Sequence, residues 1–169
     1  MTKISTFITR GKKIESIHRI KCLIINHENK TLLSSDNDND IIFPRSSIKL
    51  FQAIPFASSG AVSKFNLNSK QIALACSSHS GEKFHINELK KWLIKLSIPV
   101  KHLHCGIHNP LDLNSSNKLL LAGIKPNQLH NNCAGKHLAM LSSCKANNYE
   151  IKDYLSFTHP HQISIKNTL

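Results

Sequence analysis

The stretch IIFPRSSIKLFQAI, residues 41–54, decides the fold class, because the hydrophobic pattern changes its period within it. Ile41–Phe43 is a short apolar run, and Pro44 follows it. From Ser46 onward the apolar side chains recur three and four residues apart, as they do in a helix. A helix with apolar side chains on several sides is usually buried, so we expect residues 46–54 to form a buried helix.

The region before this stretch predicts strands. Residues 14–33 are expected to form an N-terminal hairpin, in which a polar turn separates the apolar run Cys22–Ile25 from the run Thr31–Leu33. After the stretch, residues 71–76 fit either a short buried strand or a short helix, because periodicity alone does not separate the two.

The second half of the chain predicts helices. Residues 85–97 form the clearest amphipathic pattern, since Ile86, Leu89, Leu93 and Leu96 share one face. Another helix is expected from Lys136, with Leu138, Leu141 and Cys144 on one side. A hairpin combined with helices and short strands indicates an α/β or α+β fold.

The composition limits the class of protein. The chain has 169 residues, which suits one domain or a large part of one. Its formal net charge of +12, from 22 Lys and Arg against 10 Asp and Glu, raises the question of an anionic partner such as nucleic acid. The basic residues are scattered and form no dense block, so we expect no nucleic-acid partner.

The cysteines and the apolar runs bear on location. Five cysteines at irregular spacing are not a disulfide framework. The N-terminal residues lack the apolar centre of a secretory signal, and the longest apolar runs are too short to cross a bilayer. We therefore expect a reduced, cytoplasmic protein without a membrane partner.

Ser46 and Lys49 are spaced as a nucleophile and its base. Residues three apart lie on one face of a helix, so the amine of Lys49 would be within reach of the Ser46 hydroxyl. A lysine in a dry site favours its neutral amine, which can accept a serine proton, as in Ser-Lys hydrolases. The alternative is structural: Ser46 caps the helix and Lys49 is solvated.

Two further segments combine several chemically reactive side chains. The loop CSSHSGEKFH, residues 76–85, gathers serines and histidines between an apolar segment and a helix, where functional loops often lie. The alternative is a turn in which Ser80 or Asn87 caps the next helix. The segment LHNNCAGKHLAM, residues 129–140, places Cys133 and Lys136 three apart, which suggests a zinc site or a polar loop with a helix cap.

A third segment, KHLHCGIHNP at residues 101–110, contains His102, His104, Cys105 and His108. Imidazole and thiolate groups are the usual ligands of zinc. This cluster is therefore a second place where a metal could bind, although histidines near a surface turn explain the pattern as well.

Taken together, the segments resemble the Rhizobium etli-type L-asparaginases, which form the class 3 or bacterial asparaginase II family. The matching stretches, in order, are TRGKKIESIHR (9–19), FPRSSIKLFQAIP (43–55), SGA (59–61), ALACSSHSGEKFH (73–85), CGIHNP (105–110), HNNCAGKH (130–137) and HPHQ (159–162). The seven stretches occur in the family's order, and the resemblance covers nearly all 169 residues. Seven matching stretches in this order identify the family far more specifically than a single stretch would.

The resemblance implies a fold and an activity. The implied fold is α/β, a β-lactamase- or glutaminase-like α/β sandwich with an antiparallel sheet. The implied activity is hydrolysis of L-asparagine to L-aspartate and ammonia, and the partner is this small-molecule substrate.

The resemblance also assigns roles to residues. It implies a catalytic Ser-Lys pair at Ser46 and Lys49 and a second catalytic serine at Ser78. It implies zinc ligands at Cys133 and Lys136. Arg45 and His79, which adjoin the two serines, are the residues that we expect to bind substrate.

Departures from the family pattern imply a truncated enzyme. Family members are roughly twice this length, so residues 1–169 would be the N-terminal portion of the domain and the fold would be incomplete. The lysine partner of Ser78 and a third zinc ligand would lie in the other half. We therefore expect weak zinc binding, little activity of the chain alone, and either a homodimer or a complementing C-terminal fragment. The alternatives are a non-catalytic remnant and a basic binding module.

Overall fold

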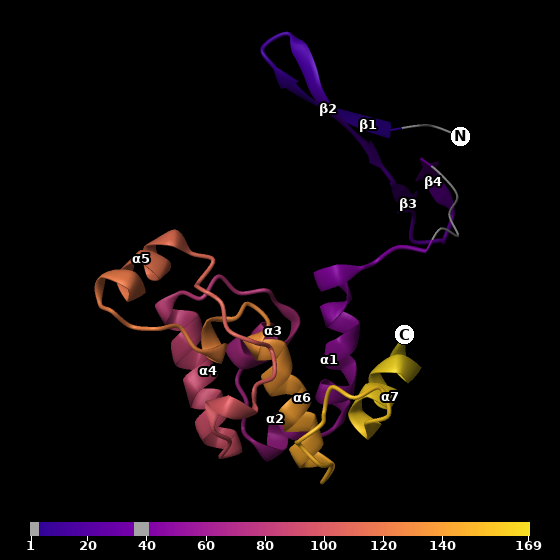
Figure 1. Cartoon of the computed structure of the whole chain (residues 1–169). Coiled ribbons are helices and arrows are strands. Elements are labelled where there is room, and N and C mark those ends of the chain that lie inside the picture. Colours follow the sequence, from indigo (N-terminus) through magenta and orange to yellow (C-terminus); the bar gives the residue numbers. More distant parts are fainter. Residues whose placement is uncertain (1–3, 36–40) are drawn as a thin grey trace. The chain divides into compact units, whose positions relative to one another are not determined.

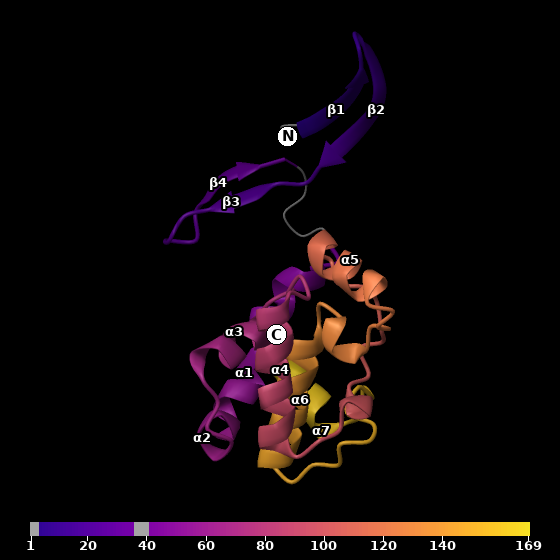
Figure 2. The same cartoon turned by 90° about the vertical axis from the view of Figure 1, so that its left-hand side faces the viewer.

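The computed structural model describes residues 4–35 and 41–169 (Figures 1 and 2). The chain divides into two compact units, residues 1–43 and residues 44–169. The described strands all lie in the first unit and the described helices all lie in the second.

Two antiparallel hairpins make up the first unit. β1 (Ile4–Arg10) pairs with β2 (Lys13–Ile20), with a register shift between Ile8 and Thr9. β3 (Leu23–Ile25) pairs with β4 (Thr31–Ser34). The predicted hairpin at residues 14–33 is therefore confirmed only for its second half. Residues 14–20 pair instead with β1, which the sequence analysis did not predict.

Side-chain caps close the turn of the second hairpin and join it to the first. The Asn26 Oδ1 accepts the backbone N–H groups of Glu28 and Lys30 at 3.0 and 2.8 Å. The Ser35 Oγ accepts the N–H of Cys22 at 2.6 Å and donates to the carbonyl of Ile20 at 3.2 Å. These bonds tie the end of β4 to the link between β2 and β3.

The second unit is helical. Its elements are η1 (Arg45–Ile48), α1 (Lys49–Ser58), α2 (Ala61–Lys64), α3 (Ser69–Cys76), α4 (Lys83–Leu96), η2 (Val100–His102), α5 (Leu113–Leu121), η3 (Gln128–His130), α6 (Ala134–Ala146) and α7 (Pro160–Thr168), where η marks a 3₁₀ helix. α6 lies among the other helices and packs against α1, α3 and α4 (Figure 1). The helix is accordingly buried over most of its length.

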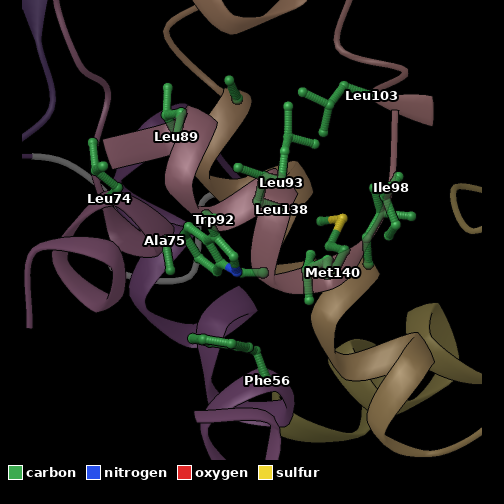
Figure 3. Close-up of a cluster of buried hydrophobic side chains, with 14 of the residues drawn as sticks. Phe56, Leu74, Ala75, Leu89, Trp92, Leu93, Ile98, Leu103, Leu138 and Met140 are labelled. Atoms are coloured by element: carbon green, nitrogen blue, oxygen red, sulfur yellow. The ribbon is translucent and has the colours of Figure 1, made fainter. Parts of the chain in front are cut away.

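The core of this unit is built around Trp92 of α4 (Figure 3). Its ring lies against the ring of Phe56 from α1, with centroids 5.8 Å apart. Its indole N–H donates to the Ser142 Oγ on α6 at 2.9 Å, so burying the indole leaves no unpaired donor. α3 and α6 approach so closely that a Cβ on Gly135 would lie 2.2 Å from the carbonyl oxygen of Leu74.

The helix predictions from periodicity are largely confirmed. The four apolar residues assigned to one face of the 85–97 helix are all buried on α4. The helix expected from Lys136 is α6, and its predicted apolar side, Leu138, Leu141 and Cys144, is fully buried. Residues 71–76, left open between strand and helix, belong to α3.

The predicted burial of residues 46–54 is wrong. α1 begins only at Lys49, after the 3₁₀ turn, and it leaves the side chains of Leu50, Phe51 and Ile54 exposed. α5 and α7 were not expected as helices. The expected fold class is confirmed: the described residues form a mixed α/β structure with short antiparallel sheets, consistent with an incomplete α/β sandwich.

Candidate functional site

Lys49 is the buried centre of the candidate site. Its side chain lies at the start of α1 and the residue is only 3% exposed. The Nζ donates to the backbone carbonyl of Ser77 at 2.9 Å and to the Ser78 Oγ at 2.6 Å. Both acceptors are uncharged oxygens. The buried Nζ is therefore satisfied by two neutral hydrogen-bond partners.

A second hydrogen bond extends the arrangement to Ser46. The Ser78 Oγ donates to the Ser46 Oγ at 3.2 Å, so Ser46, Ser78 and Lys49 form a continuous chain of polar groups. Both serines are exposed, whereas Lys49 is buried. The two hydroxyls can therefore meet a ligand from solvent while the amine stays dry behind them.

The local backbone explains why Ser46 is free to take part. Residues 45–48 form a 3₁₀ turn whose first position follows Pro44, and the side chain that bonds back to the Pro44 carbonyl is that of Ser47, at 2.5 Å. The structural alternative from the sequence is wrong on both counts, because Ser46 caps no helix and Lys49 is not solvated.

Arg45 directly precedes Ser46 and has a φ of +49°, in the left-handed region. Such a conformation is unfavourable for a residue with a Cβ, and strained residues of this kind occur often at functional sites. The Arg45 side chain is exposed beside the serine. Its predicted contact with substrate stays a prediction.

The Ser78 loop is held in place by a backbone hydrogen bond at His79 and by a close contact at Gly81. α3 ends at Cys76, and the N–H of His79 donates to the carbonyl of Asn132 at 3.2 Å. Gly81 has a φ of +83°, and a Cβ there would lie 2.9 Å from the Cβ of Pro110. Glycine is therefore required at Gly81, for its backbone conformation and for the close approach.

His79 lies next to Ser78 but is buried. Its Nδ1 accepts the N–H of Gly81 at 3.1 Å, which leaves the proton on Nε2, and among the described residues the buried Nε2 has no hydrogen-bond partner. Burial, followed by the charges of His85, Lys49 and His108, lowers the pKa of His79 to about 4. His79 is thus a neutral imidazole at neutral pH, and its predicted role in substrate binding stays a prediction.

The segments that the sequence analysis singled out separately come together here. The Asn131 Nδ2 donates to the Cys105 carbonyl at 2.6 Å, and the N–H of Asn132 donates to the His108 Nε2 at 3.1 Å. The carbonyl of Asn132 binds the Ser78 loop through His79. Residues 130–133 thus join the 76–85 loop to the 105–110 loop.

Cys133 and Lys136 lie where α6 begins. Cys133 precedes the first helical residue, and Lys136 is in the first turn. The thiol of Cys105 donates to the Gln128 carbonyl at 3.5 Å, and its pKa is raised to about 11, mainly by burial, with a smaller raising effect of Cys133 and a lowering effect of Lys136. The described residues contain no group of three or more His, Cys, Asp and Glu placed to hold a metal ion.

The histidines near the proposed metal ligands are bound to other groups. The His137 Nδ1 lies 2.6 Å from the Tyr154 hydroxyl, which also accepts the N–H of His104 at 2.9 Å. The His130 Nδ1 accepts the N–H of Asn127 at 3.0 Å. In the 101–110 segment, the second candidate for metal binding, the His108 Nε2 accepts the N–H of Asn132 at 3.1 Å, the Cys105 thiol donates to the Gln128 carbonyl at 3.5 Å, and the His104 ring stacks on Tyr154. These side chains therefore bind different partners.

A cavity of about 430 Å³ opens between α3 and α4, beside the Ser78 loop. Its lining includes Ser77, whose carbonyl binds Lys49, together with Phe84, His85 and Glu88. The volume is within the usual range of small-molecule sites.

The chain also matches a known protein family. The family model for L-asparaginase II matches residues 7–169. The chain belongs to the L-asparaginase II family. A search of curated proteins gave no match. In the part of the chain that the structure describes, none of the helices has both the length and the apolar character needed to cross a membrane.

For this member of the L-asparaginase II family, sequence reasoning missed the route from Lys49 to Ser46. The i, i+3 spacing indicates a direct contact between the two residues, whereas the recorded hydrogen bonds of the Lys49 Nζ go to Ser77 and Ser78. The resemblance names Ser78 but pairs it with another lysine. A small polar loop at the end of an apolar segment is the signal that marks Ser78.

Proposed function

We propose that this chain is a Rhizobium etli-type L-asparaginase that hydrolyses L-asparagine to L-aspartate and ammonia through Ser46, Ser78 and Lys49. The observation that carries the proposal is the continuous hydrogen-bond chain from exposed Ser46 through Ser78 to buried Lys49. Membership in the L-asparaginase II family supports the choice of substrate.

In the proposed reaction, Lys49 is the base and Ser46 is the nucleophile. The step requires Lys49 in its unprotonated form and both hydroxyls rotated, so that Ser46 donates to Ser78 and Ser78 donates to the Lys49 Nζ. Lys49 then takes the proton of Ser78 while Ser78 takes the proton of Ser46, and the Ser46 Oγ attacks the carboxamide carbon. The tetrahedral intermediate collapses as the C–N bond breaks, and the proton returns from Lys49 to the departing ammonia. Water then hydrolyses the aspartyl ester and restores Ser46.

We propose slow turnover for this chain. In the described residues, the hydrogen bonds at the two serines involve a single amine, that of Lys49. One base must therefore serve both steps of the reaction. Groups that act as a catalytic unit lose most of their rate when one is missing, by about 10³-fold or more.

The test is release of ammonia and aspartate from L-asparagine by the purified chain, compared with Ser46→Ala. We expect slow release that the substitution abolishes, and less release from L-glutamine run in parallel. Release that is undiminished in Ser46→Ala would contradict the role of this serine. Ammonia formation as fast as that of a complete two-pair enzyme would contradict the expected slow turnover.

We propose that zinc, if bound, is held by Cys133 and Lys136, with Cys105 as the nearby third donor. Two thiol groups and an amine are donors that zinc accepts, and the ion would supply Lewis-acid chemistry. Because burial raises the pKa of the Cys105 thiol, binding must displace a tightly held proton. Zinc affinity should therefore rise with pH.

Zinc titration followed by calorimetry at about pH 6 and about pH 8 tests this proposal. Binding should be tighter at the higher pH, and it should weaken in Cys133→Ala but not in Cys22→Ala, which removes a thiol of the other unit. Unchanged binding in Cys133→Ala would place the metal elsewhere.

A non-catalytic chain is the second candidate. The observation that favours it is the exposed apolar face of α1, formed by Leu50, Phe51 and Ile54, directly after Lys49. Contiguous exposed apolar side chains favour self-association or aggregation. Absence of ammonia release from a chain that size-exclusion chromatography finds aggregated would support this candidate over the first.

A further inference from the structure

A groove between α4 and α5 gathers lysines from three separate segments of the second unit. α5 lies at the same end of the helical unit as the start of α4 (Figures 1 and 2). The groove has a volume of about 400 Å³. Its cationic lining consists of Lys83 and Lys90 from α4, Lys118 from α5 and Lys125 from the loop that follows.

The nearby carboxylates are occupied outside the groove lining. Asp112 caps α5 by accepting the N–H of Ser115 at 2.7 Å, and Glu82 accepts the hydroxyl of Ser80 at 2.8 Å. Glu88 points to the other side of α4, where it pairs with Lys91 at 2.8 Å. The residues that line the groove include four lysines and no acid.

The charge of these lysines also affects a titratable group of the groove lining. The positive charge of Lys90 adds to burial in lowering the pKa of His130, which lines the same groove. Four lysines that line one hollow make its electrostatic potential positive, and a positive potential attracts an anion.

The floor of the groove is apolar. Ile86, Leu119 and Ile124 line it together with Pro110. A cavity of this size with an apolar floor and a few polar groups is typical of small-molecule sites. A phosphate would meet the lysines, while a flat or apolar group of the same ligand would cover the floor.

We propose that the groove between α4 and α5 binds a small phosphorylated molecule that carries an apolar or aromatic group. The phosphates pair with Lys83, Lys90, Lys118 and Lys125, and the apolar group packs on Ile86, Leu119 and Ile124. The proposal does not rest on asparagine hydrolysis: Gly81 of the Ser78 loop borders the groove, but the lining does not include Ser46, Ser78 or Lys49.

Isothermal titration with ATP and with inorganic triphosphate tests the site in the full chain. ATP should bind with 1:1 stoichiometry and more tightly than triphosphate, because its base covers the floor. Raising the ionic strength from about 0.01 M to about 1 M should weaken binding strongly, because the Debye length falls from about 30 Å to about 3 Å.

The decisive variant is Lys90→Ala/Lys118→Ala, and the matched control is Lys101→Ala/Lys152→Ala, which removes the same charge outside the groove lining. ATP affinity should fall about tenfold or more in the first and stay nearly unchanged in the second. An equal loss in both variants, or several ATP molecules per chain, would overturn the proposal by indicating general charge attraction. Tighter binding of a short single-stranded oligonucleotide than of ATP, lost in the same variant, would overturn it in favour of nucleic acid.

Discussion

Replacing Lys49 by methionine separates a catalytic role from a structural one. The substitution removes the Nζ and its hydrogen bonds to the Ser77 carbonyl and the Ser78 Oγ, at 2.9 and 2.6 Å, and it keeps an unbranched chain of similar length. Lys49 is 3% exposed, so the amine is desolvated in the folded protein. Losing two hydrogen bonds and relieving this desolvation act in opposite directions on the free energy of unfolding.

The two effects nearly cancel for stability. Two hydrogen bonds are worth about 1–3 kcal/mol in total, and replacing a buried polar group by an apolar one of similar volume returns a desolvation cost of about 1–3 kcal/mol. We therefore expect the free energy of unfolding of Lys49→Met to lie within about 2 kcal/mol of the parent. Activity should instead fall by about 10³-fold, equivalent to about 4 kcal/mol of transition-state stabilisation.

The assay pairs ammonia release from L-asparagine with thermal unfolding followed by circular dichroism. Lys95→Met is the matched control, because its Nζ also donates to one backbone carbonyl, of Asn66, and one side-chain oxygen, of Gln71. The control should keep its ammonia release. A Lys49→Met chain that retains its rate within about twofold, or that loses rate only in proportion to lost folded protein, would refute the reasoning.

Three other outcomes follow from the same structure. Ser78→Ala should lower ammonia release as much as Lys49→Met does, and a rate close to the parent would mean that Lys49 acts on Ser46 directly. Gly81→Ala should lower the melting temperature by several degrees, since its Cβ would press on Pro110 in an unfavourable left-handed conformation; an unchanged melting curve would contradict this. Burial lowers the pKa of His79 to about 4, so its neutral form contributes full stability above about pH 6.5 and loses it as pH falls toward 4; chemical unfolding across this range should record the loss, and a flat profile would contradict it.

The sequence predicted the parts of the fold that a strong hydrophobic period determines. The 85–97 pattern gives α4 because its apolar residues face one core, built around Trp92. α5 was not predicted, because its leucines do not face that core. Leu113, Leu120 and Leu121 are exposed, so burial imposes no helical spacing on the apolar residues of α5. β1 was not predicted, because polar and apolar residues alternate only weakly in its Ser- and Thr-rich sequence. It forms a strand by pairing with β2.

Burial of α1 was predicted wrongly for a related reason. Apolar residues around a helix predict burial only if other elements cover every side, and the described helices leave Leu50, Phe51 and Ile54 exposed. Periodicity describes the helix alone. Coverage depends on contacts between elements far apart in the sequence.

The sequence predicted which residues belong to the candidate site, but not the hydrogen bonds between them. Ser46 and Lys49 are recognisable from their spacing, and Ser78 from its loop. The hydrogen bond from Lys49 to Ser78 joins residues 29 positions apart, so it depends on how α1 packs against α3. The proximity of Cys105 to Cys133 likewise requires the tertiary fold, which brings the 105–110 loop to the start of α6.

Mapping the covalent intermediate tests the central claim most directly. The purified chain is mixed with L-asparagine, quenched in acid within the first turnover, digested, and its peptides are examined by mass spectrometry. An aspartyl ester on Ser46 that is absent in Lys49→Met and present in Lys95→Met is the predicted result. An aspartyl group on Cys133, or none on any residue while ammonia is released, would contradict a hydrolytic unit formed by Ser46, Ser78 and Lys49.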